Sequence, residues 1–150
     1  MSETPTERPT DLPSALLEHI KSLCATGYQH YDQHAYEPAL RTFYQAWVLL
    51  PKPQTQYHAA GWVLTALGDC YFQMEKWPQA LEAISSALFC PNAEKNLFAL
   101  MRKGQILYKQ GDIAAARVAL FKVYSSGGQS LLAKEPDLYL RAIADLTGSA

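Results

Sequence analysis

This chain has few cysteines, no long apolar runs and no sequence that resembles a secretory signal. Its three cysteines, Cys24, Cys70 and Cys90, are widely spaced and form no CxxC pair, which is typical of reduced thiols and not of a disulfide framework. No apolar run approaches the ~20 residues that a membrane-spanning helix needs. The polar start, MSETPTERPTD, lacks the apolar core of a secretory signal. These absences favour a cytoplasmic protein with no membrane partner.

Excess charge of either sign is missing too. The formal net charge is -1 over 150 residues. A protein that binds the phosphate backbone of nucleic acid needs clustered lysine and arginine. The sequence therefore predicts no nucleic-acid partner.

Catalytic and metal-binding motifs are also absent. The chain contains no GxxxxGK[ST], HExxH or GxSxG sequence. His30 and His34 are four residues apart, but two histidines do not make a structural zinc site. We expect Cys70 to be an inert core thiol. The sequence predicts no enzyme activity, no cofactor, no metal and no small-molecule substrate.

A repeat is what the chain does contain. Three times a glycine is followed, twelve residues later, by an alanine, and larger apolar residues recur around each pair. The pairs are Gly27 and Ala39, Gly68 and Ala80, and Gly104 and Ala116. Small residues at matched places allow two helices to cross closely, and this packing can offset the roughly 1 kcal/mol of helix propensity that glycine loses relative to alanine.

This pattern resembles the tetratricopeptide repeat (TPR), a 34-residue helix-turn-helix unit. The resemblance implies an all-α fold, in which three TPR units stack as a short right-handed solenoid with a C-terminal capping helix. Stacked repeats need such a cap to cover the last exposed face. We expect one domain over 12–146, after a disordered lead at 1–11. The repeats are expected at about 20–53, 54–94 and 97–128, with capping helices at 129–146.

The helix boundaries follow from proline, glycine and capping signals. Seven extra residues, QTQYHAA at 54–60, contain no glycine or proline, so the third helix is expected to start about two turns early. Asp11 is a candidate N-cap for the first helix. After Pro136 we expect a break and then a closing helix. The paired helices are expected at about 13–33, 36–50, 54–74, 78–89, 93–109 and 112–124.

In stacked TPR units the first helix of each pair lines a concave groove, and fixed positions around the glycine point inward. Here those positions are rich in aromatic side chains, which dominate many protein interfaces. We expect them to bind a partner protein. They are Tyr28, Tyr31 and Asp32 in the first unit; Trp62, Thr65, Asp69, Phe72 and Gln73 in the second; and Phe98, Met101, Gln105, Tyr108 and Lys109 in the third. Cys24 also projects inward, and the residues at the positions of a TPR carboxylate clamp do not predict one.

A narrower resemblance comes from QAWVLLPKPQTQYHAAGWVLTALGDCYF, ALFCPN, RKGQILYKQGD and EPDLYL. These stretches resemble a group of small bacterial TPR proteins encoded beside polymorphic toxins. The resemblance implies an immunity protein that binds and neutralises a cognate toxin domain. Two alternatives stay open. One is a TPR-type secretion chaperone that holds an extended segment of a secreted effector or translocator, and the other is a general assembly adaptor.

Overall fold

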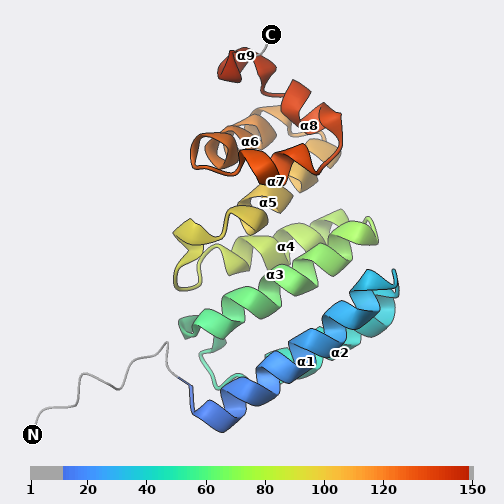
Figure 1. Ribbon diagram of the computed structural model, residues 1–150, viewed down its shortest axis with the longest axis vertical. Coiled ribbons are helices and arrows are strands. Elements are labelled where there is room, and N and C mark those ends of the chain that lie inside the picture. The colour runs from blue at the N-terminus through green and yellow to red at the C-terminus, as the bar shows by residue number, and fades with distance from the viewer. Residues whose placement is uncertain (1–11, 149–150) are drawn as a thin grey trace, which may run out of the picture.

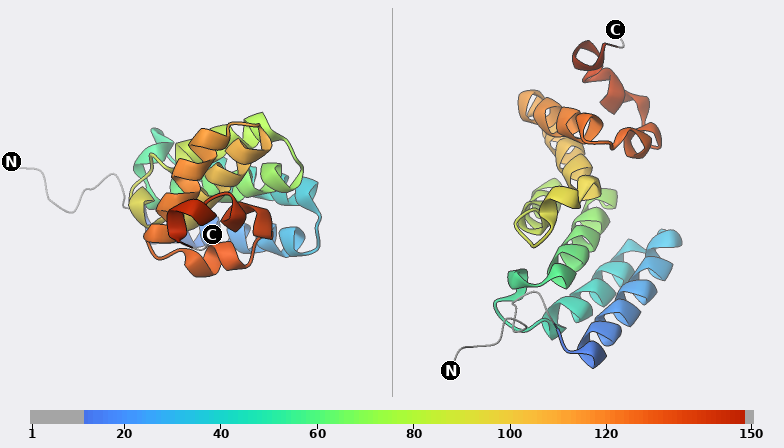
Figure 2. Two further views of the ribbon diagram at one scale, coloured as in Figure 1. Left: turned by 90° about the horizontal axis from the view of Figure 1, so that it is seen from above. Right: turned by 60° about the vertical axis from the view of Figure 1, so that its left-hand side comes forward.

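Three antiparallel helix pairs form the body of the protein. The computed structural model describes residues 12–148, and within that range the chain forms helices and turns without a strand (Figure 1). Figure 2 shows the pairs following one another along the long axis, with the C-terminal segments at one end. This confirms the predicted all-α solenoid. The pairs are α1 (Ser14–Asp32) with α2 (Tyr36–Leu49), α3 (His58–Gln73) with α4 (Trp77–Ala87), and α5 (Leu97–Lys109) with α6 (Ile113–Ser125).

The three glycines lie where the helices of each pair come closest. A Cβ atom added to Gly27, Gly68 or Gly104 would lie 2.6, 2.5 or 2.8 Å from a side-chain carbon of the second helix. The matched alanines are fully buried. The steric prediction is confirmed with one correction, because the side chain that meets each glycine comes four residues after the alanine. These side chains belong to Phe43, Ile84 and Leu120.

The predicted two-turn extension of the third helix is wrong. Residues Gln54–Gln56 form a separate 3-10 turn, and Tyr57 then has extended backbone angles (φ -105°, ψ 144°), so α3 begins at His58. The side chain of Gln54 donates a hydrogen bond of 2.9 Å to the carbonyl of Trp47. This bond holds the turn against the end of α2, so the turn is not part of α3.

The predicted start of α5 at residue 93 is also too early. Asn92 adopts a left-handed conformation (φ 64°), and Ala93–Lys95 form another 3-10 turn. Asn96 then caps α5, because its side-chain oxygen accepts a hydrogen bond of 3.1 Å from the backbone N–H of Ala99. A strong local cap of this kind ends the turn and starts the helix.

The C-terminal cap consists of α7 (Gln129–Ala133), α8 (Asp137–Arg141) and α9 (Ala144–Thr147). Pro136 makes the predicted break, but the expected single closing helix is divided into two short ones. Leu132, Tyr139 and Ile143 are buried in one cluster with side chains of α5 and α6. The cap thus covers the last pair, as the sequence predicts.

The predicted lead at 1–11, with its candidate cap Asp11, lies outside the described residues, and Pro13 occupies the N-cap position of α1. Among the helices at 12–148, none combines the length and apolar character needed to cross a bilayer.

Candidate functional site

The first helices of the three pairs lie side by side, since α1 contacts α3 and α3 contacts α5. We call the surface that α1, α3 and α5 form the inner face. Its two halves differ. A cavity opens along α3, beside the end of α4 and the turn before α5, with Tyr28 of α1 at its edge. A cluster of buried polar side chains lies between the second pair and the cap.

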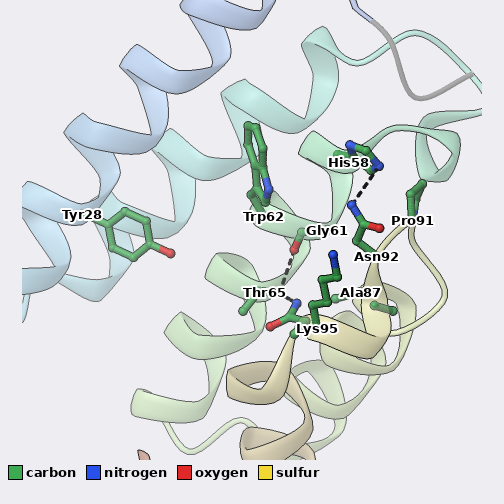
Figure 3. Close-up of a pocket in the computed structure, with 11 residues that line it drawn as sticks. Tyr28, His58, Gly61, Trp62, Thr65, Ala87, Pro91, Asn92 and Lys95 are labelled. Carbon is green, nitrogen blue, oxygen red and sulfur yellow. Dashed lines mark hydrogen bonds between the residues drawn. The ribbon is translucent and has the colours of Figure 1, made fainter. Parts of the chain in front are cut away.

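The cavity, here named the Trp62 cavity, has a volume of about 500 Å³. Two aromatic side chains stand at its edge with much of their surface free, Trp62 at 46% and Tyr28 at 42% exposure. Small side chains leave the space open. Figure 3 shows the lining residues, which come from α1, α3, the end of α4 and the turn before α5. They are Tyr28, His58, Gly61, Trp62, Thr65, Ala87, Pro91, Asn92, Ala93, Lys95 and Asn96.

Hydrogen bonds hold the wall of the Trp62 cavity in place. The hydroxyl of Thr65 donates to the carbonyl of Gly61 at 2.7 Å, and the amide of Asn96 donates to the same hydroxyl at 3.0 Å. Asn92 lies 3.2 Å from the ring nitrogen of His58. Burial raises the pKa of Tyr28 to about 12, so its hydroxyl stays protonated at neutral pH. The cavity is therefore a preformed recess with aromatic walls.

The second half of the inner face is organised by Arg102, which the sequence analysis did not single out. Its side chain is 6% exposed, and its guanidinium donates to Asp69 at 2.8 Å, to Gln105 at 2.7 Å and to Glu135 at 2.9 Å. Gln105 also donates to Glu135 at 2.8 Å. We call Asp69, Arg102, Gln105 and Glu135 the Arg102 cluster. It links α3, α5 and the segment that follows α7.

Two aromatic rings enclose the guanidinium of Arg102. Its central carbon lies 4.4 Å from the centre of the Phe72 ring and 4.7 Å from that of Phe98, within the range of a cation–π interaction. Phe72 also meets Trp77 edge to face at 5.6 Å. These half-buried rings therefore contact the protein's own arginine.

The charges in the Arg102 cluster are strongly coupled. Burial raises the pKa of Asp69, and the adjacent guanidinium of Arg102 opposes that shift. Burial alone would lower the pKa of Arg102, but the carboxylates of Asp69 and Glu135 outweigh it and raise the pKa. Arg102 thus stays charged, and the ionised Asp69 depends on it for compensation.

The predicted inner-face residues fall into three groups. Tyr28, Trp62 and Thr65 meet at the Trp62 cavity. Asp69, Phe72, Phe98 and Gln105 surround Arg102, and Tyr31 accepts a hydrogen bond of 2.9 Å from Gln73 beside them. The third group lies elsewhere. Met101 is buried in the core beneath the cap, whereas Cys24 is half-buried against the core of the first two pairs. Tyr108 packs against Tyr139, and Asp32 and Lys109 are exposed.

Several residues of the site were missed. Lys95 and Asn96 lie in a segment that we expected to be regular helix, and Asn92 lies directly before it, so the turn geometry of this segment was hidden. Arg102 carries a signal in the repeat, because the position two before the glycine is alanine in the first two units, Ala25 and Ala66, and arginine in the third. The large charged side chain at this position of the third unit indicates a contact that the first two units do not make.

Comparison with known proteins gives similarity in structure alone. No protein family model matches the sequence, and no curated protein sequence matches it either. The chain is similar to the C-terminal TPR-containing domain of a Plasmodium falciparum FK506-binding protein, with a TM-score of 0.71 and 15% identity over 93% of this chain and 96% of that one.

Two further similar structures are secretion chaperones. One is the Yersinia enterocolitica type III secretion chaperone SycD in complex with a peptide of the translocator YopD; its TM-score is 0.63 at 21% identity, over 88% of this chain and 92% of that one. The other is PcrH in complex with the chaperone-binding region of PopD, with a TM-score of 0.62 and 20% identity over 93% and 95% of the two chains. The described chain therefore has the helical solenoid fold of TPR-containing proteins.

Proposed function

We propose that this protein holds an extended segment of another protein on its inner face, as a chaperone or assembly factor does. The observation that carries the proposal is the Trp62 cavity, where two aromatic side chains remain about half exposed beside a recess of about 500 Å³. Concave sites with apolar walls and a few fixed polar groups are where ligands bind most often. Tryptophan and tyrosine are also the side chains most enriched at binding hot spots.

The shape of the inner face favours a segment over a compact domain. The Arg102 cluster occupies the half of the face nearest the cap, whereas the recess lies along α3, beside the end of α4 and the turn before α5. An extended chain can place one or two side chains in such a recess and continue along the surface. This support is independent of the similar structures, two of which hold peptides of the proteins that they serve.

The toxin-neutralising hypothesis stays a prediction. None of the similar structures named above is described as an immunity protein. The two functions differ in what they bind. A chaperone of this type needs only a short linear segment of its partner, which we expect to be a secreted, membrane-active protein, whereas an immunity protein needs the folded toxin domain.

Affinity capture followed by peptide mapping tests the proposal. The tagged protein would be used to capture partners from the organism that makes it, in parallel with Trp62→Ala and with Val48→Ala, a control on α2 that is 71% exposed. Short overlapping peptides of the captured protein would then be titrated against all three. We expect one peptide to bind, Trp62→Ala to weaken it by about 2 kcal/mol, and the control to bind normally.

Two outcomes would contradict the proposal. Binding that Trp62→Ala leaves unchanged would place the interface away from the inner face. Binding that needs a folded domain, together with loss of that domain's toxicity on coexpression, would establish the immunity function instead.

A further inference from the structure

The polar groups at the Trp62 cavity divide into those that the protein satisfies and those that it leaves for a ligand. Thr65, Asn96 and His58 have the partners described above. The ammonium of Lys95 and the indole N–H of Trp62 have no hydrogen bond or ion pair to any residue in the described part of the chain. Both groups can only donate. Both are exposed and can bind water in the free protein, so a ligand that covers them must supply acceptors in place of that water.

Charge at the cavity has one sign. Among the residues at 12–148, Lys95 is the one lining residue with a permanent charge, His58 is the other basic side chain, and no aspartate or glutamate lines the cavity. In Figure 3 the side chain of Lys95 extends from its turn toward the space between Trp62 and Asn92. Lys95 therefore lies at the solvent-exposed rim of the cavity.

Nearby carboxylates do not neutralise this lysine. Glu94 is its neighbour in sequence but lines a different cavity, between the end of α4 and α5. Asp69 lies two turns of α3 away from Gly61 and is paired with Arg102. The cavity thus combines an apolar recess with an uncompensated positive charge at its edge.

We propose that the partner segment carries an acidic residue beside a bulky apolar residue, and that Lys95 selects it. The apolar side chain enters the recess between Tyr28 and Trp62, over the small residues Gly61 and Ala87. The carboxylate then pairs with Lys95. This inference rests on the proposed function, because it names the chemistry of the segment that binds there.

The expected effect is moderate, because Lys95 is exposed. A solvent-exposed ion pair changes binding only about two- to fivefold, and replacing attraction by repulsion in Lys95→Glu should raise the effect to about tenfold. The effect should shrink as salt is added, since screening acts within about 10 Å at ordinary ionic strength.

A random peptide library displayed on phage tests this without knowledge of the partner. It would be selected in parallel on the full chain, on Trp62→Ala, on Lys95→Glu and on Lys76→Glu, a charge-matched control at the start of α4, away from the cavity. The best peptide would be synthesised with its acidic residue and with the matching amide. We expect peptides that pair Asp or Glu with a large apolar residue, about tenfold weaker binding to Lys95→Glu, and no change with Lys76→Glu.

The outcomes separate the two claims. Peptides that depend on Trp62 but show no acidic preference, or that bind Lys95→Glu normally, would overturn the inference and leave the proposed function standing. A library that yields no peptide sensitive to Trp62→Ala would overturn both. Equal binding of the acidic peptide and its amide form would refute the ion pair directly.

Discussion

Replacing Arg102 by methionine should destabilise the fold strongly at neutral pH. Methionine keeps much of the apolar volume, so the change removes the charge and the hydrogen bonds without opening a large cavity. It leaves Asp69, whose side chain is 6% exposed, without its cation. Glu135 is less affected, because its side chain is 19% exposed and keeps its hydrogen bond from Gln105.

The magnitude follows from that burial. Removing one partner of a buried ion pair typically costs about 3–5 kcal/mol, because the other charge is left uncompensated. The rings of Phe72 and Phe98 also lose a desolvated cation, which is worth up to about 2 kcal/mol. We expect a loss of about 4 kcal/mol, which is a large part of the roughly 5–15 kcal/mol that stabilises an ordinary domain.

Urea unfolding followed by far-ultraviolet circular dichroism measures this effect, provided that the slope against urea stays constant. The control is Arg141→Met on α8, because Arg141 is exposed and has no ion pair within 12–148. It should change stability little. Adding Asp69→Asn to Arg102→Met should recover more than half of the loss, since it removes the buried charge.

The pH dependence gives a second test. Burial already raises the pKa of Asp69 in the folded state, so protonation favours folding: the stabilisation is present below the unfolded pKa and is lost as pH rises through the folded one. Without Arg102 the folded pKa rises further. The deficit of Arg102→Met should therefore shrink as pH falls from neutral toward about 4. A loss below about 1 kcal/mol, or one independent of pH, would refute this explanation of the Arg102 cluster.

Three other predictions concern packing and the cap. Gly68→Ala should lower the free energy of unfolding in urea by about 1–3 kcal/mol. Gly61 lies on the same helix, and a Cβ added there would meet its nearest atom at 3.4 Å, so Gly61→Ala should be neutral or stabilising by up to about 1 kcal/mol. Equal effects of the two substitutions would contradict the steric argument. Phe72→Ala should lower the free energy of unfolding more than the affinity for a partner, since the Phe72 ring contacts Arg102. Urea unfolding and a peptide-binding titration of the same variant would compare the two losses. The hydrogen bond from Arg117 lowers the pKa of Asp145 below 3.8. The stabilisation from this pair is therefore present above pH 3.8 and is lost as pH falls through the lowered pKa. In Arg117→Gln, NMR titration of the carboxyl group should show the pKa of Asp145 returning toward 3.8.

The repeat made the helix pairs predictable. Small residues at fixed spacing, with apolar residues on both sides, leave few other ways to bury the chain, so Gly27, Gly68 and Gly104 were placed correctly at the close approaches. The rows of inner-face residues were also assigned to the right helices. These predictions depend on periodicity, which is a local property of the sequence.

The features that differ between repeats could not be predicted in the same way. The turns before α3 and α5 depend on a left-handed Asn92, an N-cap at Asn96 and a side-chain bond from Gln54, and each competes with a helix that the residue types also allow. The Arg102 cluster joins residues 33 apart in both directions along the chain. Its contacts therefore become visible only after the pairs have stacked and the cap has closed over them.

Site-specific photo-cross-linking tests the central claim, that a partner occupies the Trp62 cavity. Tyr28 and Tyr44 offer a matched pair, because they are 42% and 41% exposed and lie in the same repeat, but only Tyr28 lines the cavity. Each would be replaced in turn by a photoreactive benzoylphenylalanine in the full chain, in cells that make the partner. The account predicts a cross-linked partner from position 28 and none from position 44. A cross-link from position 44 alone would contradict it.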